Sequence, residues 1–281
     1  MPHDQIDKSA NSSAPHEIKR VRHDLKRRML TVSRVERLSP KMLRVILTGA
    51  DLAGFVSAGF DDHIKLFFPP RGAERPELPE LGPNGPVYRE GAVRPAVRDF
   101  TPRRYDAEAN ELAIDFALHD EGPAAEWAAS AEPGRFLGVG GPRGSFVVPV
   151  DFDWHLLVGD ETALPAIGRR LEELPPSTKA IVVAQVDGAS DEIALASRAD
   201  LDIRWVHRGN SPTGDGEALE KTVAELDLPA GDGYAWVACE SDLAKALRRR
   251  LLERHGLPRQ WVKAAGYWKR GAIATHERHE D

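Results

Sequence analysis

Residues 115–146 read DFALHDEGPAAEWAASAEPGRFLGVGGPRGSF and decide the fold of this chain. They predict a strand that ends at His119, a turn, a short helix that opens at Gly122-Pro123, and a glycine-rich passage over 138–145. Proline suits the first helical position because the N–H that it lacks would have no intrahelical partner there. Glycine lets a ligand approach the backbone closely, and the free N–H groups of a helix start favour an anion. The stretch therefore indicates either a phosphate site or an ordinary turn.

A second motif, Arg98-Asp99-Phe100-Thr101, stands a short distance upstream. An arginine can bind phosphate, an aromatic ring can pack against another ring system, and a hydroxyl can hydrogen-bond a ring nitrogen. Together these three residue types suit a flavin nucleotide.

The composition is that of a soluble globular protein with room for one large domain or two ordinary ones. Of the 281 residues, 41% are hydrophobic and 29% charged, and the net charge of −6 favours neither nucleic acid nor an anionic membrane as partner. The single cysteine, Cys239, excludes an intramolecular disulfide and an intrachain cysteine-ligated cluster, and a lone cysteine is more often buried than catalytic. We expect no metal site, no secretory or membrane-inserted segment, and a cytoplasmic location.

The first half of the chain has a β pattern. Strands are predicted at 31–38, 43–48, 63–68, 98–105, 111–119, 135–139 and 144–148, with a helix at 122–130. Many short strands and one helix indicate a six-stranded antiparallel barrel capped by a helix. Residues 69–95 contain seven prolines, which predicts a long surface loop that is either a lid or disordered.

After Val150 strands and helices alternate. Strands are predicted at 154–159, 179–186, 203–207, 234–239 and 261–265, and helices at 162–173, 191–196, 216–226 and 241–255. This βαβ pattern indicates a Rossmann-like parallel sheet, which binds ligands at the carboxyl ends of its strands. The predicted organisation is a flexible tail over 1–27, a barrel domain over 28–150, an α/β domain over 151–272 and a flexible tail over 273–281.

Three motifs together resemble the FAD-binding motifs of the siderophore-interacting proteins, the ferric-siderophore reductases of the ferredoxin reductase-like superfamily. They are Arg98-x-Phe100-Thr101, GPAAEWA at 122–128 and GGPRGSF at 140–146. Further matches are DHIKL at 62–66, GDETALPA at 159–166 and GYWKRG at 266–271. The resemblance covers about residues 28–271, with the motifs in family order.

The resemblance implies a flavin-binding barrel that holds FAD. Arg98 would contact the pyrophosphate, Phe100 would pack beside the isoalloxazine, and Thr101 would hydrogen-bond the ring edge near N5. Trp127 and His119 would flank the pyrophosphate, although a core tryptophan and a strand-end histidine are ordinary alternatives. The full expected FAD set is Arg98, Phe100, Thr101, His119, Gly122, Pro123, Ala124, Trp127, Gly141, Gly144 and Ser145.

The resemblance also implies a site for NADPH or NADH as electron donor. The expected residues are Asp160, Thr162, Ala163 and Glu240. Asp160 and Glu161 stand where the wider superfamily has a glycine-rich turn, so this site departs from the common pattern. Arg208 is a candidate for holding a 2′-phosphate.

A third site would bind the ferric siderophore in a shallow basic groove at the flavin edge. Lys65, Arg143, Lys269 and Arg270 are the expected cations, with solvated surface charges as the alternative. Tyr267 and Trp268 would lie against the isoalloxazine and gate the entry of hydride, or would pack a domain interface.

The implied function is reduction of Fe(III) to Fe(II), which releases iron because siderophores are hard-oxygen chelators. The chemistry belongs to the flavin, so we expect no catalytic acid, base or nucleophile on the protein. Two alternatives stay open, namely a general flavin or ferredoxin-type reductase for another acceptor and a non-catalytic siderophore-binding flavoprotein. We expect a monomer, with a reduced ferredoxin as an alternative donor.

Overall fold

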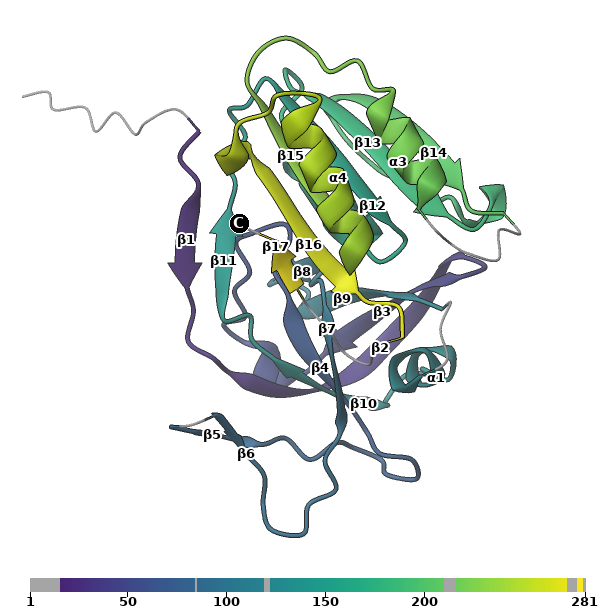
Figure 1. Ribbon diagram of the computed structural model, residues 1–281. Helices are drawn as coiled ribbons and strands as arrows, with labels where there is room; N and C mark the ends of the chain where they lie inside the picture. The colour runs from purple at the N-terminus through teal and green to yellow at the C-terminus, as the bar shows by residue number, and fades with distance from the viewer. Residues whose placement is uncertain (1–15, 84, 119–121, 210–215, 272–276, 280–281) are drawn as a thin grey trace, which may run out of the picture.

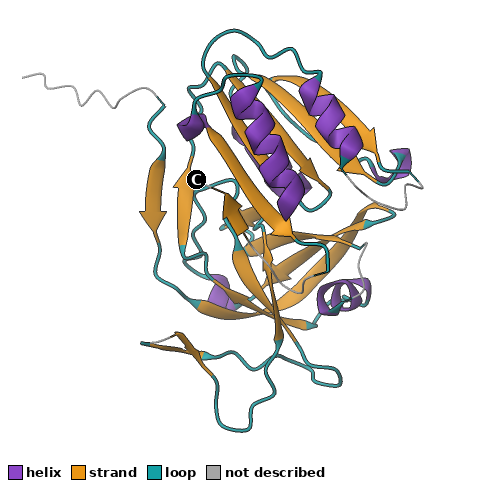
Figure 2. Cartoon of the chain, in the orientation of Figure 1, coloured by secondary structure: helices purple, strands orange, loops and turns teal. Residues whose placement is uncertain are grey.

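The computed structural model describes residues 16–83, 85–118, 122–209, 216–271 and 277–279. Two main sheets lie next to each other, a curled antiparallel sheet and a parallel sheet with helices packed on it (Figures 1 and 2). Strand β11 (Gly144–Val147) ends just before β12 (Trp154–Asp160) begins, and the predicted domain boundary falls between them.

The antiparallel sheet confirms the predicted β architecture, although it has seven strands in place of the expected six. The strand order is β7-β4-β10-β2-β3-β9-β8. The expected strand 98–105 is two strands because Pro102, which has no N–H for a ladder, separates them. The bounds are β2 (Arg27–Ser39), β3 (Met42–Thr48), β4 (Ile64–Phe68), β7 (Ala96–Phe100), β8 (Arg104–Asp106), β9 (Glu111–Ala117) and β10 (Phe136–Gly140).

An aromatic core fills the concave side of this sheet. Helix α1 (Pro123–Ala129) buries Trp127, whose ring centre lies 5.7 Å from that of Phe116 and 5.9 Å from that of Phe68. Phe100 packs on Phe116 at 4.6 Å. The helix and the flavin-like motif therefore share one core, which fixes α1 relative to the end of β7.

The second sheet has five parallel strands, with β17 (Glu277–His279) added antiparallel at one edge, in the order β14-β13-β12-β15-β16-β17. All residues of β12 are buried, as expected for a central strand covered on both faces. Helices α3 and α4 lie on one face (Figure 1) and α2 packs into the hydrophobic cluster on the other. The bounds are β13 (Lys179–Val186), β14 (Asp200–His207), β15 (Gly233–Glu240), β16 (Val262–Trp268), α2 (Leu164–Glu173), α3 (Glu217–Ala224) and α4 (Ser241–Glu253).

The structure corrects the prediction in several segments outside these sheets. Part of the predicted flexible tail 1–27 is strand β1 (Lys19–Arg22), which satisfies the backbone groups of β11 by antiparallel pairing. Part of the predicted tail 273–281 is β17, paired with β16. The predicted loop 69–95 contains the hairpin β5 (Glu80–Gly82) and β6 (Gly85–Val87). The expected helical piece 191–196 is a short 3-10 turn, η2 (Ala189–Asp191); two further turns are η1 (Ala50–Leu52) and η3 (Arg259–Trp261).

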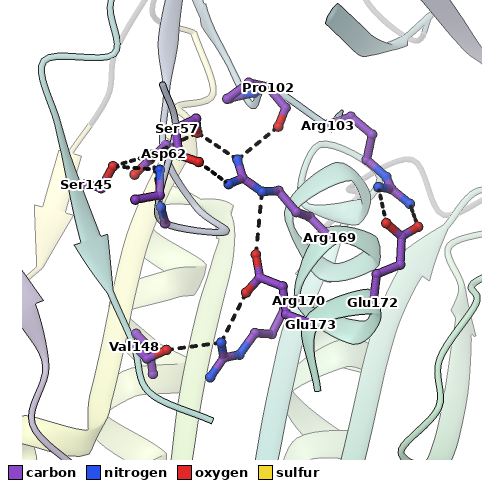
Figure 3. A network of polar contacts seen from close by, with 12 residues as sticks. Ser57, Asp62, Pro102, Arg103, Ser145, Val148, Arg169, Arg170, Glu172 and Glu173 are labelled. Carbon is purple, nitrogen blue, oxygen red and sulfur yellow. Dashed lines mark hydrogen bonds and ion pairs between the residues drawn. The ribbon is translucent and has the colours of Figure 1, made fainter. Parts of the chain in front are cut away.

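Polar side chains of α2 tie the parallel sheet to the antiparallel one (Figure 3). Arg169 donates to the Ser57 hydroxyl at 2.8 Å, to the Ser57 carbonyl at 2.9 Å and to the Pro102 carbonyl at 3.1 Å. Arg103 forms a two-bond ion pair with Glu172. Burial lowers the pKa of Arg169, which nevertheless stays cationic because arginine titrates far above neutral pH. The two sheets are thus held in a fixed relation along one side of α2.

No helix in the described ranges combines the length and the apolar character needed to span a membrane.

Candidate functional site

A cleft of about 1510 Å³ lies where the two sheets meet. Its walls come from β4, β7 and β10, from the start of α1, from the carboxyl ends of β12 and β16, and from the β5–β6 hairpin. The lining residues extend from Leu25 to Gly271, so segments far apart in the chain contribute to one surface. A single-ligand site is typically about 300–1,000 Å³. This cleft has room for more than one ligand.

The Arg98-x-Phe100-Thr101 motif lines the cleft as a unit. Arg98 is half-buried and donates to the Val97 carbonyl at 2.8 Å, so its side chain is held close to its own strand. Phe100 rests on the aromatic core beneath the cleft. Thr101 is only 6% exposed and shares a hydrogen bond with Tyr267. The motif thus joins the barrel to the end of β16.

The start of α1 forms the neighbouring part of the wall through Gly122, Pro123, Ala124 and Ala125. Gly122 has φ +153°, a region that favours glycine, and a Cβ added there would contact no other atom. The amide of Glu126 donates to the Gly122 carbonyl at 2.9 Å, which begins the helical hydrogen bonds. The N–H groups before it have no acceptor within the helix and can serve a phosphate. The residues present therefore fit a pyrophosphate.

Several expected flavin residues do not line the cleft. Trp127 is 4% exposed and belongs to the aromatic core, in line with its ordinary alternative. Ser145 is buried and donates to Asp62 at 2.6 Å, while Gly144 lies so close to β1 that a Cβ would sit 2.5 Å from the Val21 carbonyl. Of the glycine-rich passage only residues 140, 141 and 143 reach the cleft. His119 lies outside the described residues.

The expected nicotinamide residues separate into two groups. Thr162 lines the cleft, and its amide and hydroxyl both donate to Asp160, at 3.0 and 2.5 Å. Asp160 also accepts from the indole of Trp268 at 2.7 Å. Ala163 is fully buried in the core, and Glu240 caps α4 by accepting from the amides of residues 242 and 243. Only Thr162 of these four faces the cleft.

Arg208 is held by two carboxylates at the ends of neighbouring parallel strands. It donates to Glu161 at 3.0 and 2.6 Å and also to Asp187, which in turn contacts Lys41 from the turn between β2 and β3. Burial lowers the pKa of Arg208, but the hydrogen bonds to Glu161 outweigh this effect and the net pKa is raised. Arg208 is therefore a permanent cation whose charge is already balanced.

All four expected siderophore cations line the cleft, and two further arginines join them. Lys65 is paired with Asp99 at 2.8 Å. Asp115 lies in the wall as well, with its carboxylate held by Arg44 at 2.7 and 2.9 Å. The lining contains six Lys and Arg side chains against three Asp and Glu side chains, although the whole chain is acidic. The cationic residues are Arg27, Lys65, Arg98, Arg143, Lys269 and Arg270.

The aromatic pair Tyr267 and Trp268 ends β16 inside the cleft. Tyr267 meets Trp236 edge to face at 6.0 Å. Burial raises the pKa of Tyr267 and Asp61 raises it further, while the hydrogen bond with Thr101 opposes the shift, so its hydroxyl stays protonated. Each member of the pair is fixed by a polar bond, to Thr101 in one case and to Asp160 in the other.

The hairpin is the part of the site that the sequence did not indicate. Leu81, Gly82, Pro83, Gly85, Pro86 and Tyr88 all line the cleft. An Asn-Gly dipeptide, as at 84–85, is a strong hairpin signal, but the seven prolines around it predict a loop. Leu25, Arg27, His63 and Asp115 also line the cleft without having been expected there.

Cys239 is fully buried in the core of the parallel sheet. Burial raises its pKa well above the ordinary value, so the thiol is not a nucleophile. Within the described ranges, no three His, Cys, Asp or Glu side chains gather as a metal site would require.

Comparison with known proteins agrees with this layout. Sequence models of the siderophore-interacting FAD-binding domain and of the siderophore-interacting protein match residues 31–146 and 152–271. The NADPH-dependent ferric-chelate reductase of Escherichia coli (strain K12) is 42% identical over 262 residues, covering 92% of this chain and 98% of that protein. Ferric vibriobactin reductase ViuB of Vibrio cholerae is 35% identical over 247 residues, covering 87% and 90%.

Solved structures show the same relationship. The siderophore utilization protein from T. fusca has a TM-score of 0.83 and 38% identity, covering 92% of this chain and 98% of that one. SipS from Aeromonas hydrophila has a TM-score of 0.71 and 31% identity, covering 90% and 94%. A ferredoxin reductase of carbazole 1,9a-dioxygenase, at 16% identity and a TM-score of 0.58, shares the fold. The chain belongs to the siderophore-interacting protein family, within the ferredoxin reductase-like fold.

Proposed function

We propose that this protein is an FAD-containing, NAD(P)H-dependent reductase of ferric siderophores, which releases their iron as Fe(II). One NAD(P)H would reduce two ferric chelates and give one proton. The observation that carries the proposal is the single cleft in which the flavin-like motif, the carboxyl edge of the parallel sheet and a group of cations meet. The names of the Escherichia coli and Vibrio cholerae relatives support it.

The residues of the cleft fit FAD. Arg98 and the amides at the start of α1 would hold the pyrophosphate, and Phe100 and Thr101 would border the isoalloxazine. Gly141 would allow the backbone to approach the cofactor closely. When bound, FAD supplies the means of accepting hydride and passing electrons on singly. The task of the protein is to hold and shield the two reactants.

On the donor side, Thr162 would touch the nicotinamide dinucleotide, because it lines the cleft just after β12. Asp160 would orient it, because that carboxylate holds the Thr162 hydroxyl and the Trp268 indole together. Ala163 and Glu240 would act indirectly, by packing the sheet and by capping α4. Tyr267 and Trp268 would border the path between donor and flavin.

On the acceptor side, the excess of cations supplies attraction for an anionic ferric complex. Lys65, Arg143, Lys269 and Arg270 would bind its negative charge, and the charge excess is local because the whole chain carries −6. Electron transfer needs no proton from the protein, so no side chain is assigned as a catalytic acid or base.

The test is anaerobic. The FAD-loaded protein is reduced with a stoichiometric amount of NADPH, and ferric chelates are then added with a ferrous trap while the flavin spectrum is followed. Reoxidation matched by trapped Fe(II) supports the proposal, and Lys269→Gln should slow it while Arg254→Gln, an exposed change away from the cleft, should not. Reoxidation only by quinones or free flavins would indicate a general flavin reductase. Binding of chelate without reoxidation would indicate a carrier.

We propose further that the protein acts as a monomer in the cytoplasm, with reduced ferredoxin as an alternative donor. The lone buried cysteine is compatible with a reducing compartment. Sedimentation at working concentration tests the monomer. Anaerobic mixing with reduced ferredoxin tests the second donor.

A further inference from the structure

We propose that the β5–β6 hairpin selects among ferric chelates by contacting the apolar, aryl-bearing periphery of those complexes that have one. The inference rests on the proposed function and concerns the acceptor end of the same cleft. It assigns Leu81 and Tyr88 as specificity-determining residues.

Exposed apolar side chains are concentrated on this segment. Among the described residues six large hydrophobic side chains are exposed, and three of them, Leu81, Val87 and Val93, fall within 13 positions. Leu81 is 54% exposed and lines the cleft, as does the half-buried Tyr88. A single exposed leucine needs no explanation, but an apolar group on the wall of a binding cleft indicates a ligand surface.

Packing within the protein leaves Leu81 exposed, although Arg94 lies 5.4 Å from the ring centre of Tyr88. Among the strands that the structure describes, β5 and β6 pair only with each other, and an isolated two-stranded hairpin is marginally stable. Residues before the hairpin anchor it to β10. Arg75 lies 4.2 Å from the ring centre of Phe136. Leu78 covers Gly138, because a Cβ added to Gly138 would lie 2.4 Å from the Leu78 side chain. The base of the segment is therefore fixed to β10, and the tip presents its apolar residues to the cleft.

The charge of the cleft defines the ligand that would use this tip. Lys65, Arg143, Lys269 and Arg270 line the cleft and attract negative charge, while the hairpin adds apolar side chains to its wall. A ferric tris-catecholate carries its negative charge around the iron and exposes aromatic edges at its periphery. Ferric citrate is also anionic and has no apolar periphery. The hairpin should therefore strengthen binding of the ferric tris-catecholate and leave binding of ferric citrate unchanged.

The test compares the binding of two redox-inert analogues, the Ga(III) tris-catecholate and the Ga(III) citrate complexes, to the FAD-loaded protein. Leu81→Ser should weaken binding of the catecholate about tenfold, as expected for losing contact with one apolar side chain. Binding of Ga(III) citrate and of FAD should change less than about twofold. Val93→Ser is the matched control, because Val93 is 66% exposed on the same segment and does not line the cleft.

Equal weakening of both gallium complexes, or no weakening, would overturn the inference. Loss of FAD affinity in Leu81→Ser would also overturn it, since the hairpin would then cover the cofactor. Because gallium is not reduced, these outcomes do not depend on turnover. If Leu81→Ser weakens binding of the gallium catecholate but the wild-type protein reduces no ferric chelate, the proposed reductase function is refuted and the inference on the hairpin stands.

Discussion

The ammonium of Lys263 on β16 lies 2.6 Å from the carboxylate of Asp61, which belongs to the loop before β4. The side chains are only 11% and 5% exposed. The same carboxylate accepts from the indole of Trp236 at 3.0 Å, and Lys263 lies 4.0 Å from the ring centre of Phe146. A buried ion pair therefore joins the two sheets beside the cleft.

Removing one partner of this pair should destabilise the fold. Lys263→Met leaves the buried Asp61 without its ion-pair partner, which should lower the free energy of unfolding by about 3–5 kcal/mol. The double variant Asp61→Asn with Lys263→Met should recover much of the loss, because no uncompensated charge remains. Urea denaturation measures both. Asp202→Asn breaks the more exposed pair with Arg204 and should cost no more than about 1 kcal/mol. An equal loss in the single and double variants would contradict the ion-pair argument.

His155 should make the protein less stable in mild acid. Burial and, to a smaller extent, the charge of Arg170 lower its pKa to about 2, so between pH 6.5 and 2 the unfolded chain binds a proton at this histidine and the folded chain does not. Stability is then lost as pH falls below about 6.5. Between pH 7 and 5 the loss should be about 2 kcal/mol. His155→Gln should remove this part of the slope in denaturation experiments.

His16 provides a contrast of opposite sign. Its hydrogen bond to Asp151 raises its pKa, so its contribution to stability is present below pH 6.5 and is lost as pH rises through the folded pKa. His16→Gln should therefore steepen the loss of stability toward acid, whereas His155→Gln should flatten it. Slopes that change in the same direction for both variants would show that other groups dominate.

The sequence predicts both sheets and most of the cleft, because the signals for these features are local. Periodicity indicates most strands of the two main sheets, and the residues of the Arg98-x-Phe100-Thr101 and Gly122-Pro123 motifs line the cleft. What it could not predict depends on long-range contacts. Trp127 lies within a motif yet faces the core, since the face that α1 buries depends on Phe68 and Phe116.

The acidic surroundings of Arg208 illustrate the same limit. Glu161, Asp187 and Lys41 are far apart in sequence and meet only because the parallel strands end at one edge beside the β2–β3 turn. Strand β1 is a second example. It lies in a polar stretch and forms by pairing with β11, a contact that the local sequence does not indicate.

Arg98 should contribute directly to FAD affinity. Hydrogen bonds to a charged group contribute about 1.5–3 kcal/mol, so Arg98→Ala should weaken FAD binding to the apoprotein roughly 10- to 100-fold. Titration of apoprotein with FAD, followed by flavin fluorescence, measures the change. Arg104→Ala is the control, because Arg104 is exposed on β8 and does not line the cleft. Equal losses in the two variants would argue against a pyrophosphate contact at Arg98.

Asp99 should weaken the binding of anionic substrates. Its carboxylate lies 2.8 Å from the ammonium of Lys65 and cancels that charge within the cleft, and both groups are partly exposed. Asp99→Asn should therefore lower the KM for a trianionic ferric chelate about threefold at low salt. The effect should largely vanish at about 0.5 M salt, where screening is strong. Glu108→Gln, an equal charge change at an exposed position outside the cleft, should have no effect.

A neutral ferric trihydroxamate separates charge from shape in this experiment. Asp99→Asn should leave its KM unchanged, because the complex carries no net charge for Lys65 to attract. If the variant lowered the KM of the neutral and anionic chelates alike, the effect would come from altered contacts at β7. A response confined to the anionic chelate and sensitive to salt would identify Lys65 as part of the acceptor site, since Asp99 is the residue that partners it in the cleft.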